Sequence, residues 1–64
     1  MGASIVDLAN AIATMEGYYK VGSLANRNNN PGNLIVGIGQ IGTDSKGFAV
    51  FANASDGWLS LIHI

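Results

Sequence analysis

The sequence predicts an α+β fold made of one helix, a long asparagine-rich loop, a β-hairpin and the start of a second helix. Three observations support this prediction. Apolar residues recur at helical spacing near the amino terminus, glycine and asparagine interrupt the middle of the chain, and two strand-forming runs flank a polar turn. With 64 residues, the chain is long enough for one domain only.

The first helix is predicted from about Ser4 to Glu16. Ser4 is a preferred N-cap residue, and Asp7 three positions later resembles the second half of a capping box. Gly17 suits the position after a helix end, where left-handed backbone is common. The apolar residues have the i, i+3, i+4, i+7 spacing of one buried face: Ile5, Leu8, Ala9, Ile12 and Met15.

Residues 17–33 are predicted to form a loop, because glycines, an asparagine run and a Pro-Gly pair break helical and strand periodicity alike. Connections of this length in a small domain are usually functional or disordered. Apolar residues within the loop favour an ordered, packed conformation: Tyr18, Tyr19, Val21 and Leu24.

A β-hairpin is predicted next, with strands over residues 34–41 and 48–52 around a turn at 42–47. The first strand alternates only loosely. Gly37 and Gly39 leave one of its faces bare, so that another group can approach the backbone closely there.

A second helix is predicted to begin near Asp56, with Asn53 or Ser55 as its N-cap. It reaches the last residue after about two turns. The final six residues, LSLIHI, resemble the translation of a sequencing-library adapter, so we expect residues 59–64 to be a non-native tail on a single truncated domain, 1–64. One apolar side of this helix offers a face for self-association: Trp58, Leu61 and Ile62.

Composition excludes several classes of function. Three Lys and Arg against four Asp and Glu give a net charge of −1, without the basic surface of a nucleic-acid binder. With no cysteine and one histidine, no metal site is expected. No apolar run approaches the roughly 20 residues of a membrane span. The sequence GIGQIG at 37–42 matches a dinucleotide-binding fingerprint, but no helix is predicted after it, so no cofactor is expected.

Glu16 is the residue of greatest chemical interest. At about 100° per residue it projects some 20° from Ile5, near the middle of the apolar stripe. Burial and the negative end of the helix dipole both raise the pKa of a carboxyl group. A carboxyl that stays protonated near pH 7 can act as the general acid in glycoside cleavage. The alternative is a helix-terminal glutamate that turns to solvent or accepts hydrogen bonds from loop amides.

Two motifs extend this argument, namely MEGYY at residues 15–19 and GSLANRNNNPGNL at 22–34. They are followed by GQIGT, FAVF and DGW, the last at residues 56–58. Over residues 5–58 the chain resembles phage and prophage members of the lysozyme-like superfamily. The resemblance implies muramidase or lytic transglycosylase activity on the glycan strands of peptidoglycan, with Glu16 matching the catalytic acid.

The sequence departs from that family at two places. Members continue after the position of Trp58 through further helices that form the second wall of the sugar cleft, and these helices do not follow here. We therefore expect activity in a full-length parent and an inactive fragment in these 64 residues. In addition, Leu34-Ile35 stands where many relatives have Leu or Ile followed by a basic residue.

Further residues are candidates for substrate binding. Four side-chain amides could contact Glu16 or the N-acetyl and hydroxyl groups of a sugar: Asn28, Asn29, Asn30 and Asn33. Alternatively, asparagine supplies left-handed turn geometry here. Tyr18 and Tyr19 either stack on sugar rings or pack the loop. Gln40 and Thr43 could position a water, and Asp44 is either a second carboxylate or an ordinary turn residue.

A second function is kept beside cleavage, namely a non-catalytic phage virion or cell-wall-binding module on the same scaffold. The sequence between Met1 and Glu16 has no basic residue and contains Asp7, so it does not resemble a signal peptide. We expect cytoplasmic synthesis followed by phage-type release or virion association.

Overall fold

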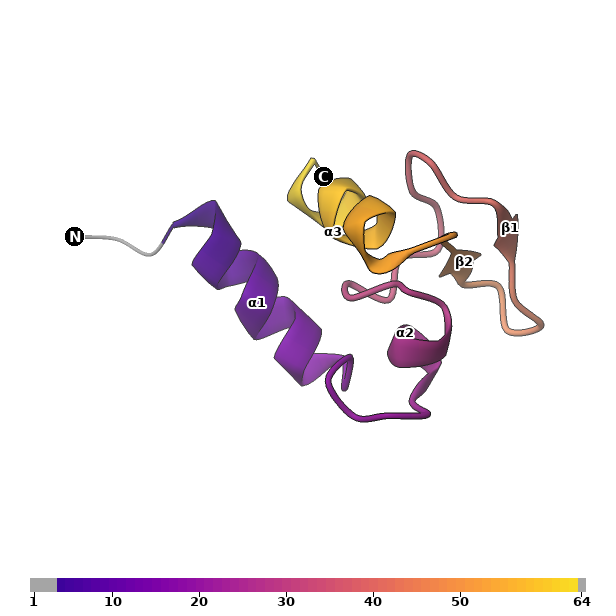
Figure 1. Ribbon diagram of the computed structural model, residues 1–64, viewed down its shortest axis with the longest axis horizontal. Helices are drawn as coiled ribbons and strands as arrows, with labels where there is room; N and C mark the ends of the chain where they lie inside the picture. Colours follow the sequence, from indigo (N-terminus) through magenta and orange to yellow (C-terminus); the bar gives the residue numbers. More distant parts are fainter. Residues whose placement is uncertain (1–3, 64) are drawn as a thin grey trace.

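A computed structural model describes residues 4–63 and shows a small α+β fold (Figure 1). Residues 4–63 form three helices and one antiparallel two-stranded sheet; the α+β class agrees with the prediction, whereas the short helix within the predicted loop was not expected. In chain order, the elements are α1 (Ile5–Met15), α2 (Leu24–Arg27), β1 (Gly42–Thr43), β2 (Ala49–Val50) and α3 (Ala54–Ile62). Helix α3 lies between α1 on one side and the hairpin on the other (Figure 1).

Helix α1 begins and ends where its local sequence predicts. The Ser4 hydroxyl accepts a hydrogen bond from the Asp7 N–H at 3.1 Å, and the Ser4 N–H donates to the Asp7 carboxylate at 3.3 Å. This pair is a complete capping box. At the other end, Gly17 has φ +75° and the Tyr18 N–H donates to the Ala13 carbonyl at 3.0 Å. These are the features of a Schellman motif, which fixes the direction of the chain after Glu16.

The hairpin is displaced from its predicted position. The strand predicted over residues 34–41 is wrong, and β1 instead occupies Gly42–Thr43, within the predicted turn. Gly42 pairs with Val50 and Thr43 with Ala49.

The physical reason for this displacement is a pair of local turns. The Gln40 side chain accepts the Gly37 N–H at 2.8 Å, and the Gln40 N–H donates back to the Gly37 carbonyl at 3.2 Å. Gly39 between them has φ +86°. Further along, Asp44 accepts the backbone N–H groups of Lys46 and Phe48, both at 2.9 Å, and so closes a shorter turn than expected.

Helix α3 begins at Ala54, slightly earlier than predicted, and its N-cap is Asn53, whose side chain accepts the Asp56 N–H at 2.9 Å. Its first turn lies directly against the loop. A Cβ atom on Gly57 would be 1.8 Å from the Asn29 carbonyl oxygen, so only glycine permits this approach. Leu61, which belongs to the expected non-native tail at 59–64, is buried in the core. The last residue of that tail, Ile64, lies outside the described residues.

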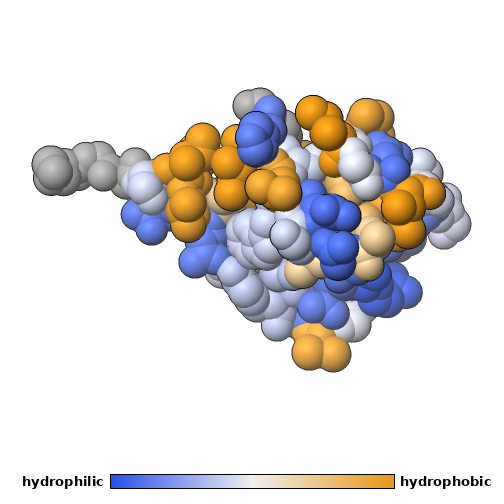
Figure 2. All heavy atoms as spheres, turned by 45° about the horizontal axis from the view of Figure 1, so that its top comes forward, coloured by the Kyte–Doolittle hydropathy of each residue, from blue (hydrophilic) through white to orange (hydrophobic). Residues whose placement is uncertain are grey.

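The buried core is small, and much apolar surface remains exposed. The buried hydrophobic residues are Ala9, Ala13, Ala25, Ala49, Phe51 and Leu61. Hydrophobic atoms gather where α1 begins, beside the grey amino terminus (Figure 2). Among residues 4–63, no helix has the length and apolar content needed to cross a bilayer.

Candidate functional site

Glu16 is the C-cap of α1, and its side chain is exposed. The expectation that it lies within a buried apolar stripe is therefore wrong. Helix α1 buries only Ala9 and Ala13, whereas Leu8 and Met15 on the predicted face are 57% and 83% exposed. Glu16 is thus an accessible carboxyl at the end of a helix whose backbone is fixed.

The amide of Asn30 connects the loop to the hairpin. Asn30 is fully buried, and its Nδ2 donates to the carbonyls of Leu34 and Ala49, both at 2.9 Å. Its Oδ1 accepts the Leu34 N–H at 3.0 Å. All three contacts are to backbone groups, so this side chain stabilises the fold and is not directed at a ligand.

The neighbouring asparagines behave similarly. Asn28 donates to the Asp44 carboxylate at 2.8 Å, and Asn29 donates to the Phe51 carbonyl at 3.0 Å. Asn29 and Asn33 have φ of +53° and +50°, the left-handed geometry that the alternative interpretation predicts. The Oδ1 of Asn33 is buried and has no hydrogen-bond partner within residues 4–63. Three of the four amides therefore contact the hairpin turn, β2 or the residue just after β2. Within residues 4–63, none of them is hydrogen-bonded to Glu16.

Gln40 and Thr43 do lie together, as a shared role in binding requires. The Gln40 Nε2 is 3.4 Å from the Thr43 hydroxyl and donates to the Gly42 carbonyl at 3.1 Å. Because the Gln40 Oε1 accepts the Gly37 N–H, both ends of this amide are used in shaping the loop.

Asp44 is a turn residue whose carboxylate is engaged on both oxygens. One oxygen accepts the Asn28 amide, and the other accepts the N–H groups of Lys46 and Phe48. These hydrogen bonds, first that of the Asn28 side chain and then that of the Phe48 N–H, lower the pKa of Asp44 below its ordinary value of 3.8. The alternative of an ordinary turn residue agrees with this geometry.

The lowered pKa of Asp44 predicts acid sensitivity of the fold. A carboxyl with a lower pKa in the folded state contributes stability above its unfolded pKa, and this stability is lost as the pH falls through the folded pKa. We expect the thermal midpoint to drop below about pH 4 and Asp44→Asn to show a weaker pH dependence than the wild type. Circular dichroism melts at several pH values test this, and an unchanged pH dependence in Asp44→Asn would contradict it.

Three aromatic rings form a cluster between α3 and the residues that follow α1. Tyr18 contacts Tyr19 and Trp58 edge to face, with ring centroids 5.2 and 5.4 Å apart. Tyr18 is half-buried, which favours packing over sugar stacking, whereas Tyr19 is 57% exposed. The Tyr19 hydroxyl donates to the Oδ1 of Asn10. The sequence alone does not identify Asn10 as a partner of Tyr19, because nine positions separate these two residues.

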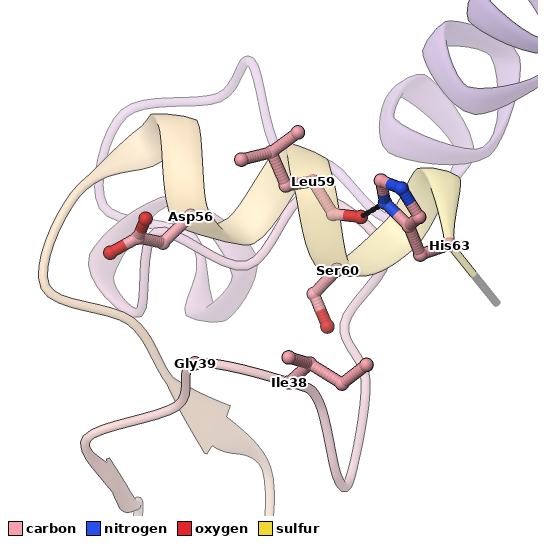
Figure 3. A pocket seen from close by; sticks show the side chains of 6 residues that line it. All are labelled: Ile38, Gly39, Asp56, Leu59, Ser60 and His63. Atoms are coloured by element: carbon pink, nitrogen blue, oxygen red, sulfur yellow. Dashed lines mark hydrogen bonds between the residues drawn. The ribbon is translucent and has the colours of Figure 1, made fainter.

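At least three hollows indent the surface of the described residues. A hollow of about 330 Å³ separates the loop at Ile38 and Gly39 from α3 (Figure 3). Asp56, Ser60 and His63 line it and are the residue types of a hydrolytic triad, but His63 Nδ1 instead lies 2.7 Å from the Leu59 carbonyl oxygen. Figure 3 shows Asp56 and His63 well apart along α3, so these three side chains do not form a triad.

The other two hollows lie against α1. One, of about 310 Å³, is lined almost entirely by aliphatic side chains of α1, α3 and residues 32–34. The other, of about 440 Å³, is lined by Val6, Asn10, Tyr19, Trp58 and Ile62. Glu16 lines none of the three. Residues 4–63 contain no cluster of three or more His, Cys, Asp or Glu side chains suited to a metal ion.

Comparison with protein-family models, curated proteins and solved structures finds no match for the chain.

Proposed function

We propose that the protein acts on the glycan strands of peptidoglycan and that, in the complete gene product, Glu16 is the general acid that cleaves them. The observation behind it is that the Glu16 carboxyl, which lies within the motifs that carry the resemblance, is accessible at the end of α1. A polymeric substrate needs such access. The motifs around Glu16 supply the substrate class through their resemblance to the lysozyme-like superfamily.

In this proposal, protonated Glu16 donates its proton to the glycosidic oxygen as the bond to the sugar carbon breaks. Asp44 is poorly suited to serve as a second carboxylate, because Asn28, Lys46 and Phe48 already donate to it. This favours the transglycosylase route, in which a hydroxyl of the substrate attacks the sugar carbon and gives its proton to the Glu16 carboxylate, so that no second carboxylate is needed.

A second candidate is a non-catalytic wall-binding or virion module on the same scaffold. Two observations favour it, namely that Glu16 lies outside the three hollows and that the amides of Asn29 and Asn30 donate to the protein's own backbone. Both candidates share a glycan ligand and differ in whether the Glu16 carboxyl is required.

Glu16→Gln separates the two candidates. In the complete gene product that contains residues 1–64, we expect this variant to clear a peptidoglycan suspension at least about 100-fold more slowly, because the amide cannot donate an acidic proton. Asp56→Asn is a matched control that removes one carboxyl from α3 and should clear at the wild-type rate. Equal clearing by Glu16→Gln would contradict the role of Glu16 as the general acid, whereas no clearing by any form would contradict cleavage and favour the binding module.

A further inference from the structure

We propose that the hollow between α1 and α3, lined by Asn10, Tyr19 and Trp58, binds one sugar unit of an N-acetylated β-1,4-linked glycan. The sugar class depends on the proposed function, whereas the location follows from the aromatic and amide groups that line this hollow. No charged side chain lines it, which suits an uncharged sugar.

The hollow has the size of a small-ligand site. Its volume of about 440 Å³ lies within the range of roughly 300–1,000 Å³ typical of such sites. Val6 and Ile62 form the rest of its lining, so that one side is aliphatic and the other aromatic. The other hollow against α1 has no comparable mixture, because aliphatic side chains dominate it.

The aromatic side supplies a surface for the apolar face of a pyranose ring. The rings of Tyr19 and Trp58 are tilted by 39° with centroids 6.4 Å apart. Tyr18 contacts Trp58 at 80°, edge to face, and so supports the half-buried indole. The C–H groups on one face of a sugar pack on such rings, while its hydroxyl groups remain free for hydrogen bonds.

The polar side supplies partners for those hydroxyl groups. The Tyr19 hydroxyl donates to Asn10 Oδ1, and within residues 4–63 no hydrogen bond uses the two N–H donors of the exposed Asn10 amide. The Tyr19 oxygen is also available as an acceptor. A bound sugar therefore meets a donor, an acceptor and an aromatic surface within one hollow, the combination expected of a specific small-ligand site.

Trp58 allows a direct test, because it is the only tryptophan in the chain. Its fluorescence is followed while the protein is titrated with the β-1,4-linked tetramer of N-acetylglucosamine. We expect a saturable change that Tyr19→Ala weakens at least tenfold and Asn10→Ala weakens severalfold. Val21→Ala, a control at a 90% exposed position that does not line the hollow, should titrate like the wild type.

The outcomes separate this site from catalysis. Retained binding by Glu16→Gln, even if cleavage fails in every form, supports the site while the catalytic proposal is lost. No saturable change in the wild type, or equal affinity in a folded Tyr19→Ala or Asn10→Ala, would overturn the site. A third outcome is a Trp58 signal that does not respond to the sugar but varies with protein concentration, together with a dimer on size exclusion. This outcome would show that a second copy occupies this face, and it would also overturn the sugar site.

Discussion

Gly57→Ala is expected to destabilise the fold by about 3 kcal/mol or more, a large part of the stability available to so small a domain. The new Cβ would lie 1.8 Å from the Asn29 carbonyl oxygen and 2.9 Å from Pro31 Cδ. Backbone atoms cannot move aside cheaply, so α3 must separate from the loop. Helix propensity alone predicts the opposite sign, a gain of about 1 kcal/mol from alanine.

Urea unfolding followed by circular dichroism measures this effect. Ser55→Ala is the matched control, because it introduces the same residue at an exposed position in the same helix. We expect its midpoint to stay within about 0.5 kcal/mol of the wild type. A Gly57→Ala midpoint equal to or above that of the wild type would contradict the close contact between α3 and the loop.

Asn30→Ala is expected to have the second-largest effect, a loss of about 3 kcal/mol. It removes two donated hydrogen bonds and one accepted bond from a fully buried position, leaving backbone groups of Leu34 and Ala49 without these partners. Asn30→Asp should be at least as harmful, because a carboxylate has the same shape but cannot donate to either carbonyl.

The same urea experiment distinguishes this role from a role in substrate binding. Asn10→Ala serves as the control, since Asn10 is an exposed asparagine in α1 and should cost less than about 1 kcal/mol. If Asn30→Ala keeps the wild-type midpoint yet loses activity on peptidoglycan, the buried hydrogen bonds are not structural and the interpretation of Asn30 is wrong.

The parts of the fold that the sequence predicts well are those fixed by neighbouring residues. Ser4 and Asp7 determine the start of α1, Gly17 its end, and Asn53 the start of α3. Each signal acts within about four positions and needs no tertiary contact. The α2 turn at Leu24–Arg27 escapes prediction because it is short and lies among loop-forming residues.

The hairpin and the asparagines depend on contacts between distant segments. Asn28 lies 16 positions from Asp44, and Asn30 lies 19 positions from Ala49. Neither pairing is visible in local periodicity. Asn29 and Asn33 adopt left-handed backbone, but residue type alone does not distinguish this role of an asparagine from ligand binding.

The exposure of Glu16 has a similar origin. Helical projection identifies which residues share a face, but it does not show whether another element covers that face. Here α1 packs mainly against α3, and Met15 beside Glu16 is 83% exposed. The candidate acid can therefore be located from the sequence, whereas its surroundings cannot.

The most direct test of the catalytic proposal is the mass of the fragments released from purified peptidoglycan by the complete gene product. We predict soluble muropeptides from the wild type, ending in an anhydro sugar if a hydroxyl of the substrate attacks. We predict almost none from Glu16→Gln, although its circular dichroism spectrum should match that of the wild type. Release of the same fragments at the same rate by Glu16→Gln would contradict the account.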